Sequence, residues 1–306
     1  MKIRRMTIDD LPLGLRLARQ AGWNQTESDW QRFMSMEPDG CFVAEIDGSS
    51  AGTTTTCIFD GVAWIAMVLV DKAVRGRGIG TGLLKHALDY LKERNVRTVR
   101  LDATPAGQPI YEKLGFVPEY ELARYEGVVK DLRLPIAGLP ISHEGTKAQS
   151  KNSSEPSCLG VLVAKIAERK SKIVFSDIIE FDHRMTGTNR EKMLTGLFEE
   201  FPELVRVVRR GNQVQGYIAG RPGANAIQVG PCIATARAGP SLLSDSLSRC
   251  MGKRVFIDVP LDNAGAVRIA EAAQLTVQRC FTRMRLGERI SDNVQAIWSS
   301  SGPEKG

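Results

Sequence analysis

The spacing of hydrophobic residues switches between two periods along the first part of the chain, which indicates alternating strands and helices. Residues 63–70 (AWIAMVLV) form a nearly unbroken apolar run, typical of a strand buried on both faces of a sheet. Residues 81–94 instead place leucines and alanines three and four positions apart, with charges opposite, as in an amphipathic helix. Residues 41–46 and a threonine-rich segment after Gly52 flank an Asp-Gly turn, which predicts a hairpin.

The same alternation continues towards residue 126. Residues 96–102 have the pattern of a strand, residues 107–114 that of a short helix ended by Gly115, and residues 116–126 that of a further strand. Strands and helices that follow one another in this order predict an α/β domain.

The second half of the chain repeats this order, which suggests a tandem duplication. The matched positions, each separated by 159 residues, are Leu83 with Leu242, Phe116 with Leu275 and Arg124 with Arg283. The strand at 99–103 (VRLDA) also resembles 255–259 (VFIDV). Two unrelated α/β domains with chance spacings stay open as the alternative.

A polar segment rich in Ser, Gly and Pro divides the two halves at residues 138–157. It has no hydrophobic period, which is typical of a linker. We therefore expect four parts, which are a domain over residues 1–137, the linker, a second domain over 158–290 and a tail over 291–306.

Composition narrows the class of protein. The chain has 306 residues, of which 42% are hydrophobic and 25% charged, as in soluble globular proteins. No apolar run approaches the roughly 20 residues of a membrane span, and no apolar stretch follows the charged N-terminus, so we expect a cytoplasmic protein without a membrane partner. Six scattered cysteines form no CxxC pair and lie near no histidines at ligand spacing, so we expect reduced thiols and no metal site.

The net charge of +6 is unevenly distributed. Residues 1–137 hold 18 basic and 18 acidic side chains, so the whole excess lies in the rest of the chain. No segment there combines a basic run with interleaved aromatic residues, and we expect no nucleic-acid partner.

The segment at 75–80 (RGRGIG), here called the glycine-rich loop, carries the most specific chemistry. It joins a predicted buried strand to a predicted helix, so its backbone N–H groups and the helix dipole would meet at one point. Glycines permit close approach of a ligand, and Arg75 and Arg77 add positive charge. The spacing fits neither a P-loop, which needs Lys-Ser/Thr, nor a GxGxxG fingerprint, because Thr81 stands at the third glycine position.

The loop resembles the R/Q-x-x-G-x-G/A signature of the GNAT N-acetyltransferase superfamily, in the form Arg75-x-x-Gly78-x-Gly80. A second family feature, YEKLGF at 111–116, follows the next strand. The resemblance covers roughly residues 1–130 and implies a mixed α+β sheet, acetyl-CoA as co-substrate, and a splayed strand that binds pantetheine. The residues implied to bind acetyl-CoA are Val68, Leu69, Val70, Arg75, Gly76, Arg77, Gly78, Ile79, Gly80 and Thr81.

The resemblance also implies that Tyr111 is the general acid that protonates the departing thiolate. A phenol suits this step because its usual pKa, about 10, is near that of an alkyl thiol. No general base is assigned, and Asp102, Glu45 and Asp71 stay open as candidates. Thr104 stands where many relatives have an asparagine that contacts the cofactor, which puts that contact in doubt.

The sequence gives few indications of the acceptor. Trp23 and Asn24 fall in the first helical region, which lines the acceptor side in the GNAT fold. Asp182 and Arg190 lie on the first helical region of the second half and could reach a cleft between the domains.

The second half resembles a GNAT domain that has lost its site. At the offset of 159, the glycine-rich loop maps to 234–239 (ATARAG), which keeps one glycine, and Tyr111 maps to Ala270. We therefore expect a catalytic N-terminal domain and a degenerate C-terminal one, in an enzyme that acetylates a primary amine of a small molecule, including one with an acidic group. A non-catalytic acetyl-CoA sensor or scaffold and a peptide or protein acetyltransferase are the alternatives. A monomer and a homodimer are equally compatible with the sequence.

Overall fold

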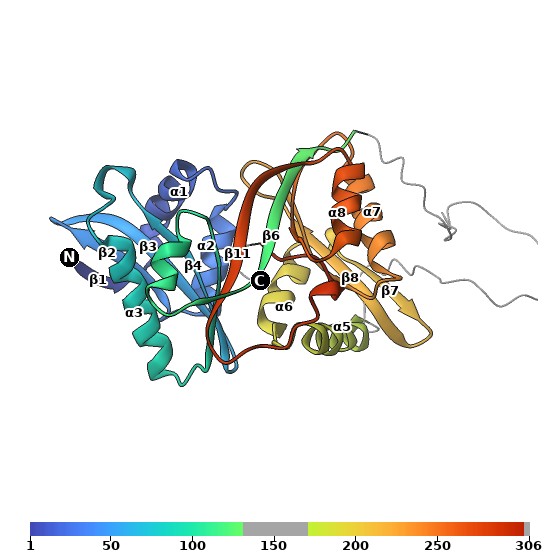
Figure 1. Cartoon of the computed structure of the whole chain (residues 1–306), viewed down its shortest axis with the longest axis horizontal. Helices are drawn as coiled ribbons and strands as arrows, with labels where there is room; N and C mark the ends of the chain where they lie inside the picture. The colour runs from blue at the N-terminus through green and yellow to red at the C-terminus, as the bar shows by residue number, and fades with distance from the viewer. Residues whose placement is uncertain (131–170, 303–306) are drawn as a thin grey trace, which may run out of the picture.

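The computed structural model describes residues 1–130 and 171–302, and the predicted linker lies outside them (Figure 1). The first half keeps the predicted order of strands and helices. Its elements are β1 (Lys2–Arg5), α1 (Leu11–Gln20), α2 (Glu27–Met36), β2 (Cys41–Ile46), β3 (Ser49–Phe59), β4 (Val62–Val70), α3 (Ile79–Glu93), β5 (Thr98–Ala103), α4 (Gln108–Glu112) and β6 (Val117–Val128), with short 3-10 turns at Ile8–Asp10 and Lys72–Val74.

The second half repeats this series from two helices to a last long strand. Its elements are α5 (Ser171–Thr186), α6 (Glu191–Glu200), β7 (Arg206–Arg210), β8 (Gln213–Arg221), β9 (Ile227–Ala234), α7 (Gly239–Arg249), β10 (Arg254–Pro260), α8 (Ala264–Ala272), β11 (Thr276–Gly287) and β12 (Ile297–Ser299), with 3-10 turns at Pro202–Leu204 and Val294–Ala296. β12 has no counterpart in the first half. It lies within the segment expected to be a tail, yet its residues are buried.

One mixed sheet of twelve strands runs through both halves, in the order β1-β2-β3-β4-β5-β11-β6-β10-β9-β8-β7, and β12 pairs with β9. The last strands are exchanged between the halves. β11 lies between β5 and β6, and β6 lies between β11 and β10, so each half completes the sheet of the other. Figure 1 shows β6 and β11 side by side at the junction. The sequence did not predict this exchange.

Each exchanged strand brings a buried arginine to an aspartate of the other half. Arg283 on β11 lies opposite Asp102 on β5, with Nε and Nη2 donating to the carboxylate at 2.8 and 2.9 Å. Arg124 on β6 lies opposite Asp258 on β10, with both contacts at 2.8 Å. These four residues occupy matching places in the repeat. Removing one partner of such a pair typically costs about 3–5 kcal/mol because the other charge is left buried and uncompensated, so each half supplies a charge that the other half needs.

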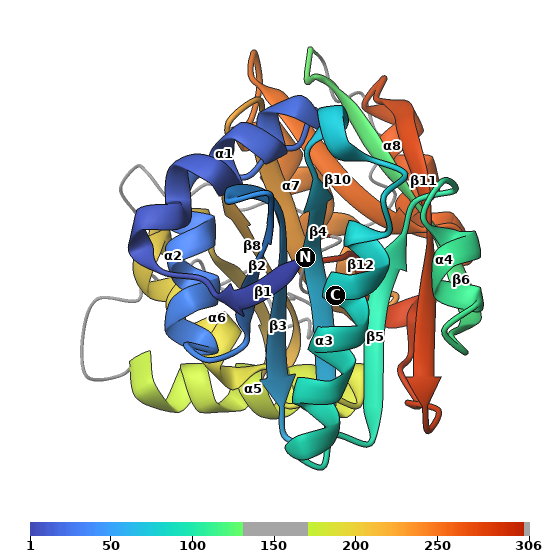
Figure 2. The same cartoon turned by 90° about the vertical axis from the view of Figure 1, so that its left-hand side faces the viewer.

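Helices cover both faces of the first half's sheet (Figure 2). Leu83, Leu84 and Leu91 of α3 pack with Val99 and Leu101 on one face. On the other face, a larger cluster joins side chains of α1 and α2 to side chains of α5 and α6. The α1–α2 face of the first half is therefore continuous with the core of the second.

The remaining expectations concern cysteines, metals and membranes. Among the described residues, Cys41, Cys57, Cys232 and Cys250 are buried free thiols and Cys280 is an exposed one, while Cys158 lies outside them. In those residues, no group of three or more His, Cys, Asp or Glu side chains is placed to hold a metal ion. No described helix has both the length and the apolar character that a membrane span requires.

Candidate functional site

β4 and β5 begin as a parallel pair and then separate. Their pairing covers only Val62–Trp64 and Thr98–Arg100. Further along β4, the register with β3 shifts between Thr53 and Thr55, and Met67 has a positive φ of 50°. This irregularity turns β4 away from β5, so the ends of the two strands leave a cleft between them.

A cavity of about 830 Å³ occupies this cleft. Its wall includes the end of β4, the glycine-rich loop, the start of α3, the end of β5 and the turn of α4. Side chains from the exchanged strands β6 and β11 close another side. The cavity therefore joins the predicted cofactor loop to the junction between the two halves.

The backbone of the glycine-rich loop has room for a ligand. Gly76 and Gly78 have φ angles of 79° and 77°, and a Cβ at either position would meet no atom within 4 Å. Gly78 is the residue immediately before α3, a helix of 15 residues. Arg75 is held beside the loop because its Nε donates to the Val70 carbonyl at 3.1 Å. Open backbone, a helix N-terminus and a guanidinium meet here, and this combination fits a pyrophosphate.

Nine of the ten residues expected to bind acetyl-CoA line the cavity, which are Val68, Leu69, Val70, Arg75, Gly76, Gly78, Ile79, Gly80 and Thr81. Arg77 does not line it. Its guanidinium donates to Asp47 at 3.3 Å on the exposed side of the loop. The structure therefore gives Arg75, and not Arg77, a place beside the cavity.

Tyr111 lies on α4 and lines the cavity from the α3 side. Its ring packs edge-on against Phe116, with ring centroids 6.0 Å apart. No described residue hydrogen-bonds its hydroxyl group, which leaves the group available to a ligand. Burial raises the pKa of Tyr111 to about 12. The phenol therefore keeps its proton at neutral pH.

The three candidate bases are each held by an arginine. Asp102 lines the cavity, but both of its oxygens accept hydrogen bonds from Arg283. Burial raises the pKa of Asp102 and the Arg283 charge opposes that rise. Glu45 is paired with Arg4, and the hydrogen bond from Arg16 lowers the pKa of Asp71. None of the three carboxylates stands free beside the cavity.

Thr104 lines the cavity, and its hydroxyl oxygen also accepts a hydrogen bond from the Gly107 N–H at 3.3 Å. This contact stabilises the turn that leads into α4. Thr104 thus positions the segment that carries Tyr111.

The two residues expected on the acceptor side separate in the structure. Trp23 lines the cavity. Asn24 is fully buried and is not part of the cavity wall, because its side-chain oxygen accepts from the N–H groups of Asn225 and Ala226 and its Nδ2 donates to the Ala226 carbonyl. Asn24 therefore fastens the α1–α2 connection to the second half.

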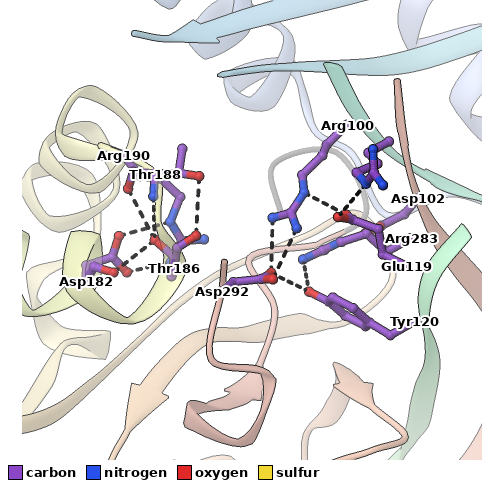
Figure 3. A network of polar contacts seen from close by, with 11 residues as sticks. Arg100, Asp102, Glu119, Tyr120, Asp182, Thr186, Thr188, Arg190, Arg283 and Asp292 are labelled. Carbon is purple, nitrogen blue, oxygen red and sulfur yellow. Dashed lines mark hydrogen bonds and ion pairs between the residues drawn. The ribbon is translucent and has the colours of Figure 1, made fainter. Parts of the chain in front are cut away.

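Asp182 and Arg190 lie inside the second half and are absent from the cavity wall (Figure 3). Arg190 donates to both carboxylate oxygens of Asp182, at 3.0 and 2.6 Å, and the Tyr217 hydroxyl donates to Asp182 at 2.5 Å. These two charges satisfy each other in the core, so the structure does not place them at the cavity, and their contact with an acceptor stays a prediction.

A second buried cluster in Figure 3 surrounds the Asp102–Arg283 pair. Arg100 of β5 donates to both oxygens of Asp292 and is paired with Glu119 at 2.8 Å. Because Asp292 follows β11, this contact binds the C-terminal segment back onto the first half.

The cavity wall also includes side chains that were not predicted as site residues, among them Gln25, Arg124, Arg279 and Phe281. Gln25 belongs to the same segment as Trp23. The other three lie on the exchanged strands, so their position depends on the exchange. The repeat of Arg124 at Arg283 was the available signal, because a buried arginine in a strand requires a carboxylate partner.

Comparison with known proteins identifies a related domain in each half. The family model described as acetyltransferase (GNAT) family matches residues 9–116, and one described as acetyltransferase (GNAT) domain matches residues 178–299. The predicted duplication is confirmed by these two matches.

Individual relatives support the same architecture. A holothin acyltransferase from Pseudoalteromonas sp. is 22% identical over 248 residues, which cover 80% of this chain and 74% of that protein. The crystal structure of a putative acetyltransferase from Pyrococcus horikoshii superposes with a TM-score of 0.76 at 23% identity, covering 100% of this chain and 95% of that one. A tandem GNAT protein from the clavulanic acid biosynthesis pathway has a TM-score of 0.60 at 14% identity, covering 95% and 99%.

Proposed function

The chain belongs to the GNAT acetyltransferase family, and from that premise we propose that it transfers the acetyl group of acetyl-CoA to a primary amine of a small molecule. The observation that carries the proposal is the single cavity that joins the glycine-rich loop, the splayed end of β4 and the free hydroxyl of Tyr111. A merely solvated surface loop would have no reason to share a cavity with the hydroxyl of a half-buried tyrosine.

The first half would bind the two parts of acetyl-CoA, the pyrophosphate and the pantetheine arm, with different groups. The N-terminus of α3, the glycine-rich loop and Arg75 would bind the pyrophosphate. The backbone of Val68, Leu69 and Val70 would pair with the pantetheine arm on the side that faces β5, because β5 pairs with β4 only at Val62–Trp64 while β3 occupies the other side. When bound, acetyl-CoA supplies a thioester carbonyl that a neutral amine can attack.

The protein's own part in the reaction is to polarise that carbonyl and to supply a proton. A backbone N–H of β4 at Leu69 or a neighbouring residue would donate to the carbonyl oxygen. As the new C–N bond forms and the C–S bond breaks, the thiolate of CoA would take the proton of the Tyr111 hydroxyl. The attacking nitrogen would release its extra proton to solvent, and solvent would return a proton to the phenolate.

Replacing Tyr111 by phenylalanine tests this role, because the ring and its packing remain while the proton is lost. We expect kcat to fall by roughly 10²- to 10⁴-fold with little change in the affinity for acetyl-CoA. Tyr125→Phe is the matched control, since Tyr125 is a buried tyrosine of β6 that packs in the second half's core.

Turnover by Tyr111→Phe at the wild-type rate would assign the proton to another group. Tight binding of acetyl-CoA by the wild-type protein, without turnover of any amine, would support a sensor instead. Turnover confined to peptide amines would replace the small-molecule acceptor. Cytoplasmic location and the choice between monomer and homodimer stay predictions.

A further inference from the structure

The exchanged strands form a wall of the cavity on the side away from α3. Arg283 contacts Asp102 and also lies over the Trp64 ring, 4.6 Å from its centroid. Trp64 belongs to the core cluster under α1 and α2, whereas α3 packs on the opposite face. Residues two apart on a strand share a face, so Arg279 and Phe281 of β11 point to the same side as Arg283. Both line the cavity there.

This placement separates Arg279 from the proposed phosphate site. The glycine-rich loop leads into α3, on one face of the sheet, and Arg279 reaches the cavity from the other face. A ligand group bound by Arg279 would therefore belong to the molecule that approaches from the α1–α2 side. In the proposed reaction that molecule is the acceptor.

Arg279 is the arginine of this wall that the described residues leave uncompensated. Its register partner Arg124 is bound to Asp258 at 2.8 Å, and Arg283 is bound to Asp102. Arg279 itself is half-buried, donates from Nε to Gln278 at 3.1 Å and forms no ion pair with any described carboxylate. Burial and the charge of Arg124 lower the pKa of Arg279, while Asp258 and Glu126 act more weakly in the opposite sense. A ligand anion would compensate this charge.

The whole cavity wall has an excess of positively charged side chains. Its ionisable side chains, tyrosine apart, are Lys72, Arg75, Arg124, Arg279 and Asp102. The one carboxylate among them is already bound by Arg283. An acceptor that carried only positive charge would meet repulsion with no compensating group.

Gln25 provides a second contact on the same cavity. Its side chain is 4% exposed, and its Oε1 is buried without a hydrogen-bond partner among the described residues. A buried carbonyl oxygen without a partner is costly, so a ligand N–H or O–H would be bound there with little competition. An amine acceptor brings such a donor.

We propose that the acceptor carries an anionic oxygen group, a carboxylate or a phosphate, in addition to its amine, with Arg279 binding the anion and Gln25 accepting a hydrogen bond from the acceptor. This inference rests on the proposed function and makes it more specific. Arg279 is then the specificity residue, and it belongs to the half of the chain without a cofactor loop.

The test uses pairs of amines that differ only in the anion. One arm compares ω-amino carboxylates with their primary amides, and the other compares O-phosphoethanolamine with ethanolamine. We expect wild-type kcat/KM to be higher for the anionic member of at least one pair. Arg279→Gln should lower kcat/KM for that member about 10- to 100-fold, as expected for a lost charge-assisted contact, and leave the neutral member within about twofold. Arg279→Lys should retain part of the preference.

Two controls separate this inference from the proposed function. Arg249→Gln removes an exposed arginine of α7 that is paired with Asp245, and it should change neither preference. Acetyl-CoA affinity, measured by calorimetry, should be unchanged in Arg279→Gln. Equal use of both members of every pair, or an equal loss for both in Arg279→Gln, would overturn the role of Arg279 while the acetyltransferase stands. Failure of every amine, charged or neutral, would instead overturn the proposed function.

Discussion

The cleft between β4 and β5 and the cleft between β9 and β10 begin alike and end differently. In the first half the parallel pairing stops at Trp64 and Arg100, and in the second it stops at Phe256 and Gln228. The first cleft contains the cavity. In the second cleft β12 pairs with β9, and the Ser300 N–H donates to the Asp258 carbonyl of β10 at 2.8 Å.

Trp298 fills the place where a cofactor would have to lie in the second half. Its Nε1 donates to the Ala234 carbonyl at 3.2 Å, and its ring covers Gly239, where α7 begins, and Gly265 of α8. The helix N-terminus that would bind phosphate by analogy with α3 is therefore covered by an indole. The chain's own C-terminal segment closes the second cleft.

The difference shows how two copies of one fold can take different roles in a single protein. Both halves keep the sheet, because each needs the last strand of the other. Only the first keeps the loop, the open cleft and the tyrosine, since Ala270 stands at the position that matches Tyr111. The second half contributes Arg279 and Phe281 to the first half's cavity wall instead.

The largest effect is expected when the halves are separated. A fragment of residues 1–137 contains every predicted catalytic residue, but β5 would lose its neighbour β11 and Asp102 would lose Arg283. We expect no cooperative thermal unfolding and no binding of acetyl-CoA by this fragment. A fragment that unfolds cooperatively and binds acetyl-CoA would show that the exchange is dispensable.

Removing the indole that closes the second cleft should have the next largest effect. Trp298→Ala leaves a cavity in a packed region and should lower the free energy of unfolding by about 3–5 kcal/mol in a denaturant titration. Trp23→Ala, in the open first cleft, should cost less than half as much. Comparable losses for the two variants would argue that the clefts are equally filled.

A smaller effect is expected from pH on kcat/KM, through Tyr111, which has no counterpart in the second half. Burial raises the pKa of Tyr111 to about 12, so the acid form persists as pH rises until about that value. With saturating acetyl-CoA, kcat/KM for the amine should rise as the amine loses its proton and should show no falling limb up to about pH 10. A falling limb that begins near pH 8 or 9 and disappears in Tyr111→Phe would contradict the raised pKa.

The sequence predicted those features that depend on local pattern. The apolar run became β4, and the leucines of 81–94 became the buried face of α3, which starts at Ile79 because the left-handed Gly78 precedes it. The glycine-rich loop and Tyr111 could be placed on one cavity because their motifs are short and contiguous.

Features that depend on distant contacts were not predictable in this way. The exchange of β6 and β11 depends on pairing between residues more than a hundred positions apart. The hydrophobic alternation of these strands would be the same if each paired within its own half. Asn24 was assigned to the acceptor because the first helical region lines the acceptor side in the GNAT fold, and Asp182 and Arg190 because their region could reach a cleft between the domains. The structure buries all three side chains with partners. Asn24 is bound to Ala226, 202 residues away, and Arg190 is bound to Asp182, eight residues before it. A polar side chain is buried only where it has such partners, and hydrophobic periodicity in the sequence does not identify them.

The most direct test of the account is the number of acetyl-CoA molecules that one chain binds. Calorimetric titration of the full chain should give one site per chain, and Gly78→Glu should abolish it, because a carboxylate would enter the space of the pyrophosphate at a backbone angle that L side chains rarely adopt. Gly252→Glu is the matched control, since Gly252 has a similar φ of 75° and open space but lies away from the cavity. Two sites per chain, or one site that survives in folded Gly78→Glu, would contradict the claim that the first cleft alone binds acetyl-CoA.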